Sequence, residues 1–254
     1  MPELDLICLA NSYKYGGRCI AGLRTNGGGW VRPVTAAEHG VFGRDDYGQM
    51  AAFEPRILDV MRTPLAGARP VASQPENWLI DGGRWRLVER PASREWAGVL
   101  EAAVCRGPAL LEGTERAIPE GAFRRRAAEA SLALVEPEQL VWRRCFDENT
   151  MRLKDRAVFK LAGASYALPL TDPVFLEGLK ALREGEHASE EIGIPAGRTV
   201  LLTISLSEPY HGYCYKLAAA VVVLPAEWGR RGTGKPAVST VLPGGTVASG
   251  GGLR

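Results

Sequence analysis

The sequence has few cysteines and histidines, and it lacks long apolar runs. Its five cysteines are scattered without a C-x-x-C pair, and it has three histidines. We therefore expect neither a disulfide framework nor a zinc cluster, and a reducing, cytoplasmic compartment fits best. No run approaches the roughly 18 apolar residues of a membrane helix, and Met1–Ala10 lacks the basic residues of a secretory signal. We expect no metal, no cofactor and no membrane contact.

The chain also lacks a strong net charge. It carries 31 basic and 29 acidic residues among 254, a formal net charge of +2. This balance excludes a histone-like polycation, but a local basic patch is enough to bind nucleic acid. Arginine-rich clusters occur at Arg124–Arg126, Arg143–Arg144, Arg152 with Lys154 and Arg156, and Arg230–Arg231. Each cluster fits either phosphate binding or an ordinary solvated surface.

Short strand-like runs dominate both halves of the chain. We expect strands at Leu4–Ala10, Arg18–Leu23, Trp30–Val34, Pro55–Thr63, Trp78–Ile80, Arg84–Glu89, Ser131–Val135, Leu140–Phe146, Met151–Leu161, Ser165–Pro169, Arg198–Ser207 and Tyr213–Leu224. Each half thus holds about five strands and one helix, the content of a small Greek-key barrel such as an OB fold. An SH3-like or PUA-like barrel has a similar strand count. The predicted fold class is mainly β (α+β), with two small OB-like β-barrels packed together.

Three glycine-containing turns separate the predicted strands. Gly27–Gly29 lies between two early strands, and Ala162–Ala164 has the composition of a hairpin turn. Asp81–Gly83 predicts a hairpin that joins Trp78–Ile80 to Arg84–Glu89.

Two helices are predicted from their N-terminal signals. Ser93 is a candidate N-cap for a helix at Arg94–Cys105, which has apolar residues at helical spacing. Asp172 followed by Pro173 is expected to start a helix of about a dozen residues.

Composition divides the chain into four segments. We predict an N-terminal OB-like barrel at 1–112, a charged connection at 113–130 and a C-terminal OB-like barrel at 131–228. The remaining segment, 229–254, is rich in glycine and small residues and contains no acid. We expect it to be a disordered basic tail.

The most informative motif is the glycine-rich, basic stretch Asn11–Gly22. Its glycines permit a tight turn and a close approach to a ligand. Lys14 and Arg18 supply cations, and Tyr13 and Tyr15 offer ring faces. This loop fits a phosphate-binding loop, and it equally fits a β-hairpin turn with solvated cations.

The strand that follows combines an aromatic residue with a cation. Trp30 and Arg32 are two residues apart in Gly29–Val34, so they share one face. Together they are able to stack a base and hold a phosphate. Alternatively, Trp30 belongs to the core and the stem of Arg32 covers it.

A second aromatic motif lies at Ser207–Leu217. Tyr213 and Tyr215 share one face of the predicted strand, Lys216 lies on the other face, and Glu208 precedes the strand. The segment fits a loop with aromatic packing. It also fits a cleft in which Glu208 and Lys216 form a charge pair while the tyrosines stack a ligand.

Four stretches carry a resemblance to a known family: CLANSYKYGGRCIAG, GGWVRPV, YALPLTDP and LLTISLSEPYHGYCYKLAAAVV. In these stretches the chain resembles the bacterial dual OB-domain proteins. The resemblance implies a nucleic-acid-binding module of two OB-like barrels, found in conflict or defence contexts, and it transfers no catalytic residue. The matching positions are Asn11, Ser12, Lys14, Gly17, Arg18, Trp30, Arg32, Pro33, Glu208, Pro209, Tyr213, Tyr215 and Lys216.

These observations predict a non-enzymatic protein that binds single-stranded RNA or DNA in a basic, aromatic groove. Lys14, Arg18 and Arg32 are expected to line one electropositive surface. The full candidate nucleic-acid-binding set is Asn11, Ser12, Lys14, Tyr15, Gly17, Arg18, Trp30, Arg32, Glu208, Tyr213, Tyr215 and Lys216.

The alternative is a small nuclease or nucleotide hydrolase. No G-x-S-x-G elbow, Walker loop or G-x-G-x-x-G after a strand supports it. It would need Lys14, Arg18, Glu208 and Lys216 to converge in one cleft. A hydrogen bond between Glu208 and a lysine or cysteine in a closed pocket would favour it.

Overall fold

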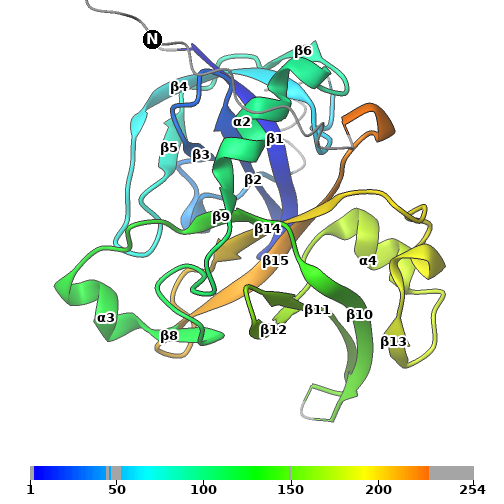
Figure 1. Cartoon of the computed structure of the whole chain (residues 1–254). Helices are drawn as coiled ribbons and strands as arrows, with labels where there is room; N and C mark the ends of the chain where they lie inside the picture. The colour runs from blue at the N-terminus through cyan, green and yellow to red at the C-terminus, as the bar shows by residue number, and fades with distance from the viewer. Residues whose placement is uncertain (1–2, 44–45, 47–52, 149, 229–254) are drawn as a thin grey trace, which may run out of the picture.

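The computed structural model describes residues 3–43, 46, 53–148 and 150–228, and most regular structure in it is β-strand (Figure 1). The predicted fold class is confirmed by a closed barrel and a second, open barrel-like unit. The predicted tail at 229–254 lies outside the described residues.

The first unit is a closed five-stranded barrel. Its neighbour order is β1-β2-β3-β5-β4, and β1 also pairs with β4, which closes the ring. β3 and β5 are parallel neighbours, whereas the other pairs in the ring are antiparallel. Strand β6 extends the sheet beyond β4. The strands are β1 (Glu3–Lys14), β2 (Gly17–Arg24), β3 (Trp30–Val34), β4 (Val60–Ala68), β5 (Asn77–Ile80) and β6 (Arg86–Glu89).

The second unit consists of two sheets. One has the order β12-β11-β10-β13 and the other β7-β9-β14-β15-β8, and a bridge between Leu170 and Ala218 connects them. The strands are β7 (Val104–Cys105), β8 (Ala117–Pro119), β9 (Leu132–Val135), β10 (Glu138–Asp147), β11 (Arg152–Leu161), β12 (Ala164–Pro169), β13 (Gly185–His187), β14 (Val200–Leu206) and β15 (Tyr213–Val223).

Helices are short and lie outside the sheets (Figure 1). Asp172 caps its helix as predicted, because its side chain accepts hydrogen bonds from the backbone N–H groups of Val174 and Phe175. The helices are α2 (Ala97–Ala103), α3 (Glu120–Arg125), α4 (Pro173–Leu179) and the 3-10 turns η1 (Glu38–Gly40), η2 (Arg94–Trp96), η3 (Ser189–Ile192) and η4 (Ala226–Trp228).

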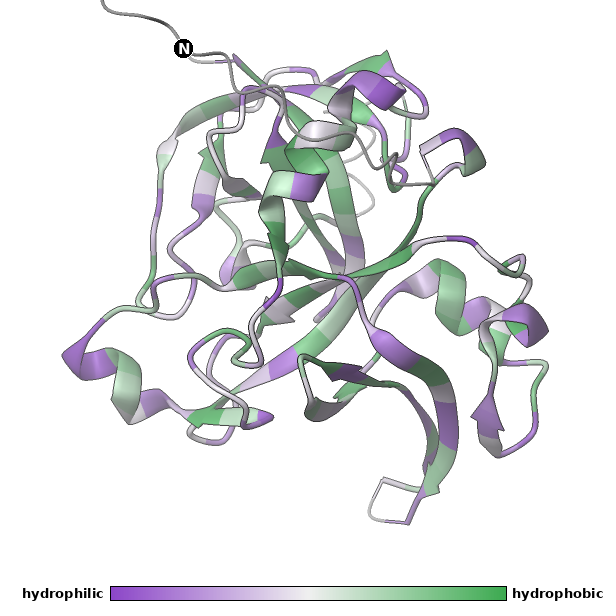
Figure 2. Cartoon of the chain, in the orientation of Figure 1, coloured by the Kyte–Doolittle hydropathy of each residue, from purple (hydrophilic) through white to green (hydrophobic). Residues whose placement is uncertain are grey.

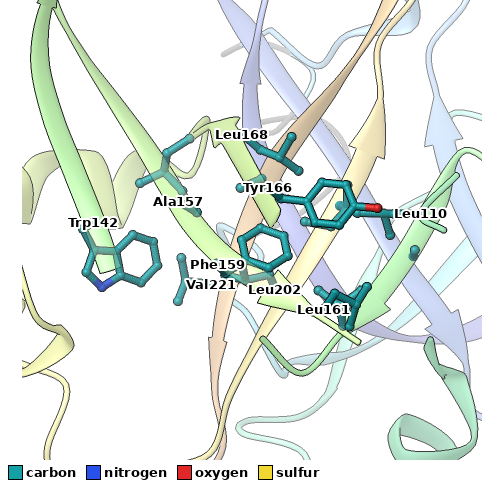
Figure 3. Close-up of a cluster of buried hydrophobic side chains, with 14 of the residues drawn as sticks. Leu110, Trp142, Ala157, Phe159, Leu161, Tyr166, Leu168, Leu202 and Val221 are labelled. Carbon is teal, nitrogen blue, oxygen red and sulfur yellow. The ribbon is translucent and has the colours of Figure 1, made fainter. Parts of the chain in front are cut away.

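An apolar core fills the space between the two sheets of the second unit. Trp142, Phe159 and Tyr166 of β10, β11 and β12 belong to one buried cluster with Leu202 and Val221 of β14 and β15 (Figure 3). The hydropathy colouring shows that the green, apolar strands meet at the centre, whereas much of the β10–β11 hairpin is purple (Figure 2).

A continuous apolar seam joins the two units. Ile7 and Leu9 of β1 pack in one buried cluster with Leu201 and Val222 of the second unit. A second cluster combines Ala10 and Ala21 with Leu132, Ala219 and Ala220. Small alanine side chains allow β1 to approach β15 closely, and the Thr203 hydroxyl donates a buried hydrogen bond to the Leu9 carbonyl. One face of the first barrel is therefore covered by the second unit.

Some local predictions agree with the structure and others do not. Turns at Gly27–Gly29 and at Ala162–Gly163 connect paired strands as expected. The predicted hairpin at Asp81–Gly83 is wrong, because β4 lies between β5 and β6 and pairs with both. The Ser93 side chain makes no cap hydrogen bond, and the helix after it ends at Ala103 because β7 then pairs with β9.

Residues 113–130, predicted to be a connection, include β8 and α3. β8 pairs with β15 through Tyr213 and Pro119, so this stretch contributes to the sheet of the second unit. The unit boundaries at 112 and 130 stay a prediction.

Candidate functional site

The turn between β1 and β2 places two tyrosines at the surface. Tyr15 and Gly16 both have positive φ angles, 46° and 78°, as in a type I′ hairpin turn. Gly17 lies against the backbone at Phe42, where a Cβ would come within 2.7 Å of the carbonyl oxygen. Tyr13 and Tyr15 remain 53% and 54% exposed. The glycine-rich motif is thus a hairpin turn that presents two aromatic rings.

A polar clasp holds this turn against the segment before β15. The Lys14 Nζ lies 2.9 Å from Glu208 Oε1 and donates to the His39 carbonyl at 2.7 Å. The other Glu208 oxygen lies 2.8 Å from His39 Nδ1, and the His39 ring stacks on Tyr15 with centroids 3.9 Å apart. These residues, which we call the clasp, bring together candidates from both ends of the chain.

A pocket opens between the clasp and the seam. Its volume is about 300 Å³, at the small end of the range for ligand pockets. We call it the tyrosine pocket. Its lining comprises Ser12, Tyr13, Lys14, Tyr15, Cys19, Gln74, Pro169, Thr171, Ser205, Leu206, Ser207, Glu208, Tyr210, Tyr215, Leu217 and Ala219. Both units contribute to it.

Two tyrosines of this pocket, Tyr15 and Tyr215, interact with charged groups. Burial raises the pKa of Tyr15, and the nearby Glu208 and Tyr210 raise it further. Tyr210 itself is 56% exposed, and the Arg116 guanidinium lies over the ring of Tyr215, 5.8 Å from its centroid. The aromatic walls therefore come from the β1–β2 turn on one side and from the segment around β15 on the other.

A larger groove lies on the other side of Tyr13, which lines both hollows. Its volume is about 900 Å³, and Arg18, Arg56 and Arg90 contribute cations to it. The Arg18 guanidinium lies 4.6 Å above the Tyr13 ring. We call this hollow the arginine groove.

Carboxylates offset much of the charge in the arginine groove. Arg18 lies 3.2 Å from Glu54, and Arg90 lies 2.6 Å from the buried Asp59. Arg56 is exposed at the groove. One terminal nitrogen of Arg18, Nη1, is buried and has no hydrogen-bond partner among the described residues.

Arg32 does not belong to this surface, so the expected alignment of Lys14, Arg18 and Arg32 is wrong. The Arg32 side chain is fully buried in the seam. Its guanidinium donates to Asn77 Oδ1 at 3.0 Å, Ser131 Oγ at 2.9 Å and Ser205 Oγ at 3.1 Å. Because these partners come from both units, Arg32 is a structural cation rather than a surface one.

Trp30 and Lys216 are also not exposed at the surface. Trp30 is half-buried and packs against two apolar clusters of the seam. Lys216 is fully buried and donates to the Gly113 carbonyl at 2.6 Å. Burial lowers the pKa of Lys216 to about 8, although Glu115 and Glu112 oppose this shift. Lys14 and Glu208 do meet, but the four-residue cleft with Lys216 does not form.

The other candidates hold varied positions around the two hollows. Asn11 lines the arginine groove and donates to the Pro55 carbonyl at 2.8 Å, whereas Ser12 lies buried in the tyrosine pocket. Tyr215 lines the tyrosine pocket, and the half-exposed Tyr213 has its ring centroid 6.3 Å away. Alternating burial in β15 agrees with the predicted faces of this strand.

Sequence reasoning missed several residues of the two hollows. Tyr13 was noted for its ring face but left out of the candidate set, and Tyr210 lies within the second aromatic motif, so the aromatic character of both was a usable signal. Gln74, Arg56 and Arg90 lie in stretches without any motif, and they reach the hollows through strand pairing that local patterns do not encode.

The described part of the chain shows neither a cluster of metal ligands nor a membrane-spanning helix. No group of three or more His, Cys, Asp or Glu side chains is placed to hold a metal ion in that part of the chain. None of its helices is long and apolar enough to cross a bilayer.

Comparison with known proteins places the fold in a family. A family model described as a dual OB-containing domain matches residues 4–221. The comparison with curated proteins found no match. Among solved structures, the crystal structure of the tetrameric p202 HIN2 is similar at 10% sequence identity and a TM-score of 0.30, over 88% of this chain and 92% of that chain.

Proposed function

This chain belongs to the dual OB-containing domain family, and on that premise we propose that it binds single-stranded nucleic acid along the seam between its two units. OB folds bind oligonucleotides on the face of their second and third strands and with the loops after the first and fourth strands. Here the second unit covers part of that face, while both loops reach the tyrosine pocket through Tyr15 and Gln74. Binding is therefore displaced to the rim of the seam.

The observation that carries the proposal is the stack of Arg18 on the exposed Tyr13, at the junction of the two hollows. An exposed ring beside a guanidinium suits a base next to its phosphate. Stacking requires an exposed base face, so single strands are favoured over duplexes. Each stacked base contributes about 1–3 kcal/mol.

The charges around the two hollows support a binding affinity for single strands that depends only modestly on salt concentration. Lys14 and Arg18 already face Glu208 and Glu54, so a phosphate has to compete with a carboxylate at each cation. For single strands, the slope of log affinity against log salt is about −0.7 per phosphate contact. We expect two phosphate contacts, at Arg18 and Arg56, and most of the affinity from stacking.

The test is binding of labelled single strands of about 12 nucleotides, within the site sizes known for OB folds. Fluorescence anisotropy across a salt series is expected to detect binding of the wild-type protein to RNA or DNA. Substituting Arg18→Ala and Arg56→Ala together should weaken binding about tenfold or more and reduce the salt slope by about one to two units. A hairpin duplex of equal length should bind more weakly.

The matched control removes two cations that lie away from the seam. Arg152→Ala with Lys160→Ala makes the same charge change on exposed positions of β11. It should leave affinity and salt slope unchanged. The proposal fails if the wild-type protein binds no single strand at low salt, or if both double variants weaken binding equally.

A second candidate is hydrolysis of nucleotides or nucleic acid, favoured by the clasp. Glu208 contacts both Lys14 and His39 beside a pocket, an arrangement able to move protons. Under this candidate, wild-type protein converts oligonucleotides or nucleoside triphosphates to products seen by chromatography, and Glu208→Gln abolishes the conversion. Unchanged substrates after incubation with wild-type protein would reject it. A role in bacterial defence and a cytoplasmic location stay predictions.

A further inference from the structure

We propose that the tyrosine pocket is a binding site for a single nucleobase, which enters it while the sugar and phosphate remain outside. This inference deepens the proposed function, because it assigns one base of a bound strand to a defined site. The pocket would equally accept the base of a free nucleoside.

The aromatic residues that line the tyrosine pocket fit a flat ring as the ligand. Tyr15 and Tyr210 are more than half exposed and come from different units, yet both line this one small pocket. Apolar packing does not account for rings that remain this exposed. Aromatic faces bind flat rings of any sequence by stacking, so a nucleobase is the fitting class of ligand.

The volume of the tyrosine pocket also fits a single base. A volume of about 300 Å³ suits one flat ring system with its sugar at the mouth, rather than a dinucleotide cofactor or a folded peptide segment. Pro169, Leu217 and Ala219 supply apolar contacts to the pocket lining. A ring that enters is therefore removed from water on its faces.

The polar groups of the pocket lining also fit the edge of a base. Gln74 is buried, and its amide uses one donor on the Leu206 carbonyl at 3.0 Å and one acceptor site on Asn77 at 3.4 Å. A primary amide has two donors and two acceptor sites, so one of each remains without a partner among the described residues. An adjacent donor and acceptor match the edge of a nucleobase. Ser12 and Ser205 add hydroxyls to the lining.

The charges of the pocket lining also fit an uncharged base. The cation and the carboxylate of the pocket, Lys14 and Glu208, neutralise each other in the clasp. The pocket therefore favours an uncharged ring and leaves phosphates to the arginine groove on the other side of Tyr13. This division assigns base and backbone to neighbouring hollows.

Free nucleosides test the pocket without any phosphate contact. Saturation-transfer NMR with the full chain is expected to detect adenosine, guanosine, cytidine or uridine with a dissociation constant of about 0.1–1 mM, and to detect no binding of ribose 5-phosphate, which lacks a base. Equal signals from ribose 5-phosphate and the nucleosides would overturn the proposal.

Two variants remove the aromatic walls while they preserve the fold. Tyr15→Asn suits the positive φ at this position, since asparagine tolerates the left-handed region, and Tyr210→Ala shortens an exposed side chain. Each should weaken nucleoside binding about tenfold. Phe146→Ala is the matched control, because Phe146 is an exposed aromatic residue of β10 that lies outside the pocket lining. Thermal melts monitor folding of all three.

The outcomes separate this inference from the proposed function. If single strands bind but the Tyr15→Asn and Tyr210→Ala variants retain wild-type affinity for nucleosides and strands, the pocket assignment is wrong and strand binding stands. If nucleosides bind in a tyrosine-dependent way but strands do not, the pocket assignment stands and strand binding is wrong. If neither ligand binds, both are wrong.

Discussion

Replacing Arg32 with alanine is expected to lower the free energy of unfolding by about 3–5 kcal/mol, the range for removing one partner from a buried charged network. The guanidinium joins Asn77 of the first unit to Ser131 and Ser205 of the second. The neighbouring Glu76 accepts hydrogen bonds from both the backbone N–H and the hydroxyl of Ser131. Alanine would leave the oxygens of Asn77, Ser131 and Ser205 without the hydrogen bonds that Arg32 donates. It would also leave a cavity in the seam.

Chemical denaturation with a fitted m-value measures this change. Arg56→Ala is the matched control, since it removes an exposed arginine and should stay within about 0.5 kcal/mol of wild type. An Arg32→Ala midpoint equal to that of wild type would contradict the structural role of Arg32. Protein that remains folded should retain its affinity for single strands, because Arg32 does not reach the surface.

The fate of Arg32 shows what a strand pattern alone omits. Alternation along β3 places Trp30 and Arg32 on one face, and such a face is normally assigned to solvent when it carries a charge. Here the second unit packs against the barrel, so β3 is covered on both faces and Arg32 finds polar partners in the seam. The partners Ser131 and Ser205 are far along the chain, and no local signal identifies them.

Local signals did predict local structure. Asp172 forms its cap, and the glycine-rich turns connect neighbouring strands, because both features depend on a few consecutive residues. The hairpin expected at Asp81–Gly83 failed for a non-local reason, since β4 separates the two strands and pairs with each. Barrel closure thus overrides turn composition.

The residues of the candidate site could be predicted in part, whereas the contacts between them depend on the fold. Lys14 and Glu208 were both selected for their chemistry, but only the fold brings them to 2.9 Å. Lys216 was selected with them as the expected charge partner of Glu208 in a cleft. The side chains of β15 alternate, however, so Lys216 points into the interior while Tyr215 faces the pocket.

Replacing Lys216 with methionine is expected to stabilise the protein by about 3 kcal/mol near pH 7, less the lost hydrogen bond to Gly113. Burial lowers the pKa of Lys216 from 10.5 to about 8, so keeping the ammonium charged in the folded state costs free energy. Methionine fills a similar volume without a charge. The Gly113 carbonyl keeps a second hydrogen bond, which it accepts from the Leu110 backbone N–H at 2.9 Å.

The stabilisation should depend on pH in a defined direction. Above about pH 10.5 the lysine is neutral in both folded and unfolded chains, so wild type and Lys216→Met should differ little. As the pH falls from about 10.5 to 8, the unfolded wild-type chain takes up a proton that the folded chain does not, and the free energy of unfolding decreases. Below pH 8 both states are protonated, and the full difference remains.

Urea unfolding of both proteins at pH 7, 8, 9 and 10 measures this difference curve directly. Taking the difference cancels the groups that the two proteins share and that titrate in the same range. Lys160→Met is the matched control, because Lys160 is exposed on β11 and should give a difference that is small at every pH. A Lys216→Met difference that stays constant from pH 7 to 10 would show that the buried ammonium is not the source of the effect, since only a shifted pKa makes the stability of the two proteins diverge with pH.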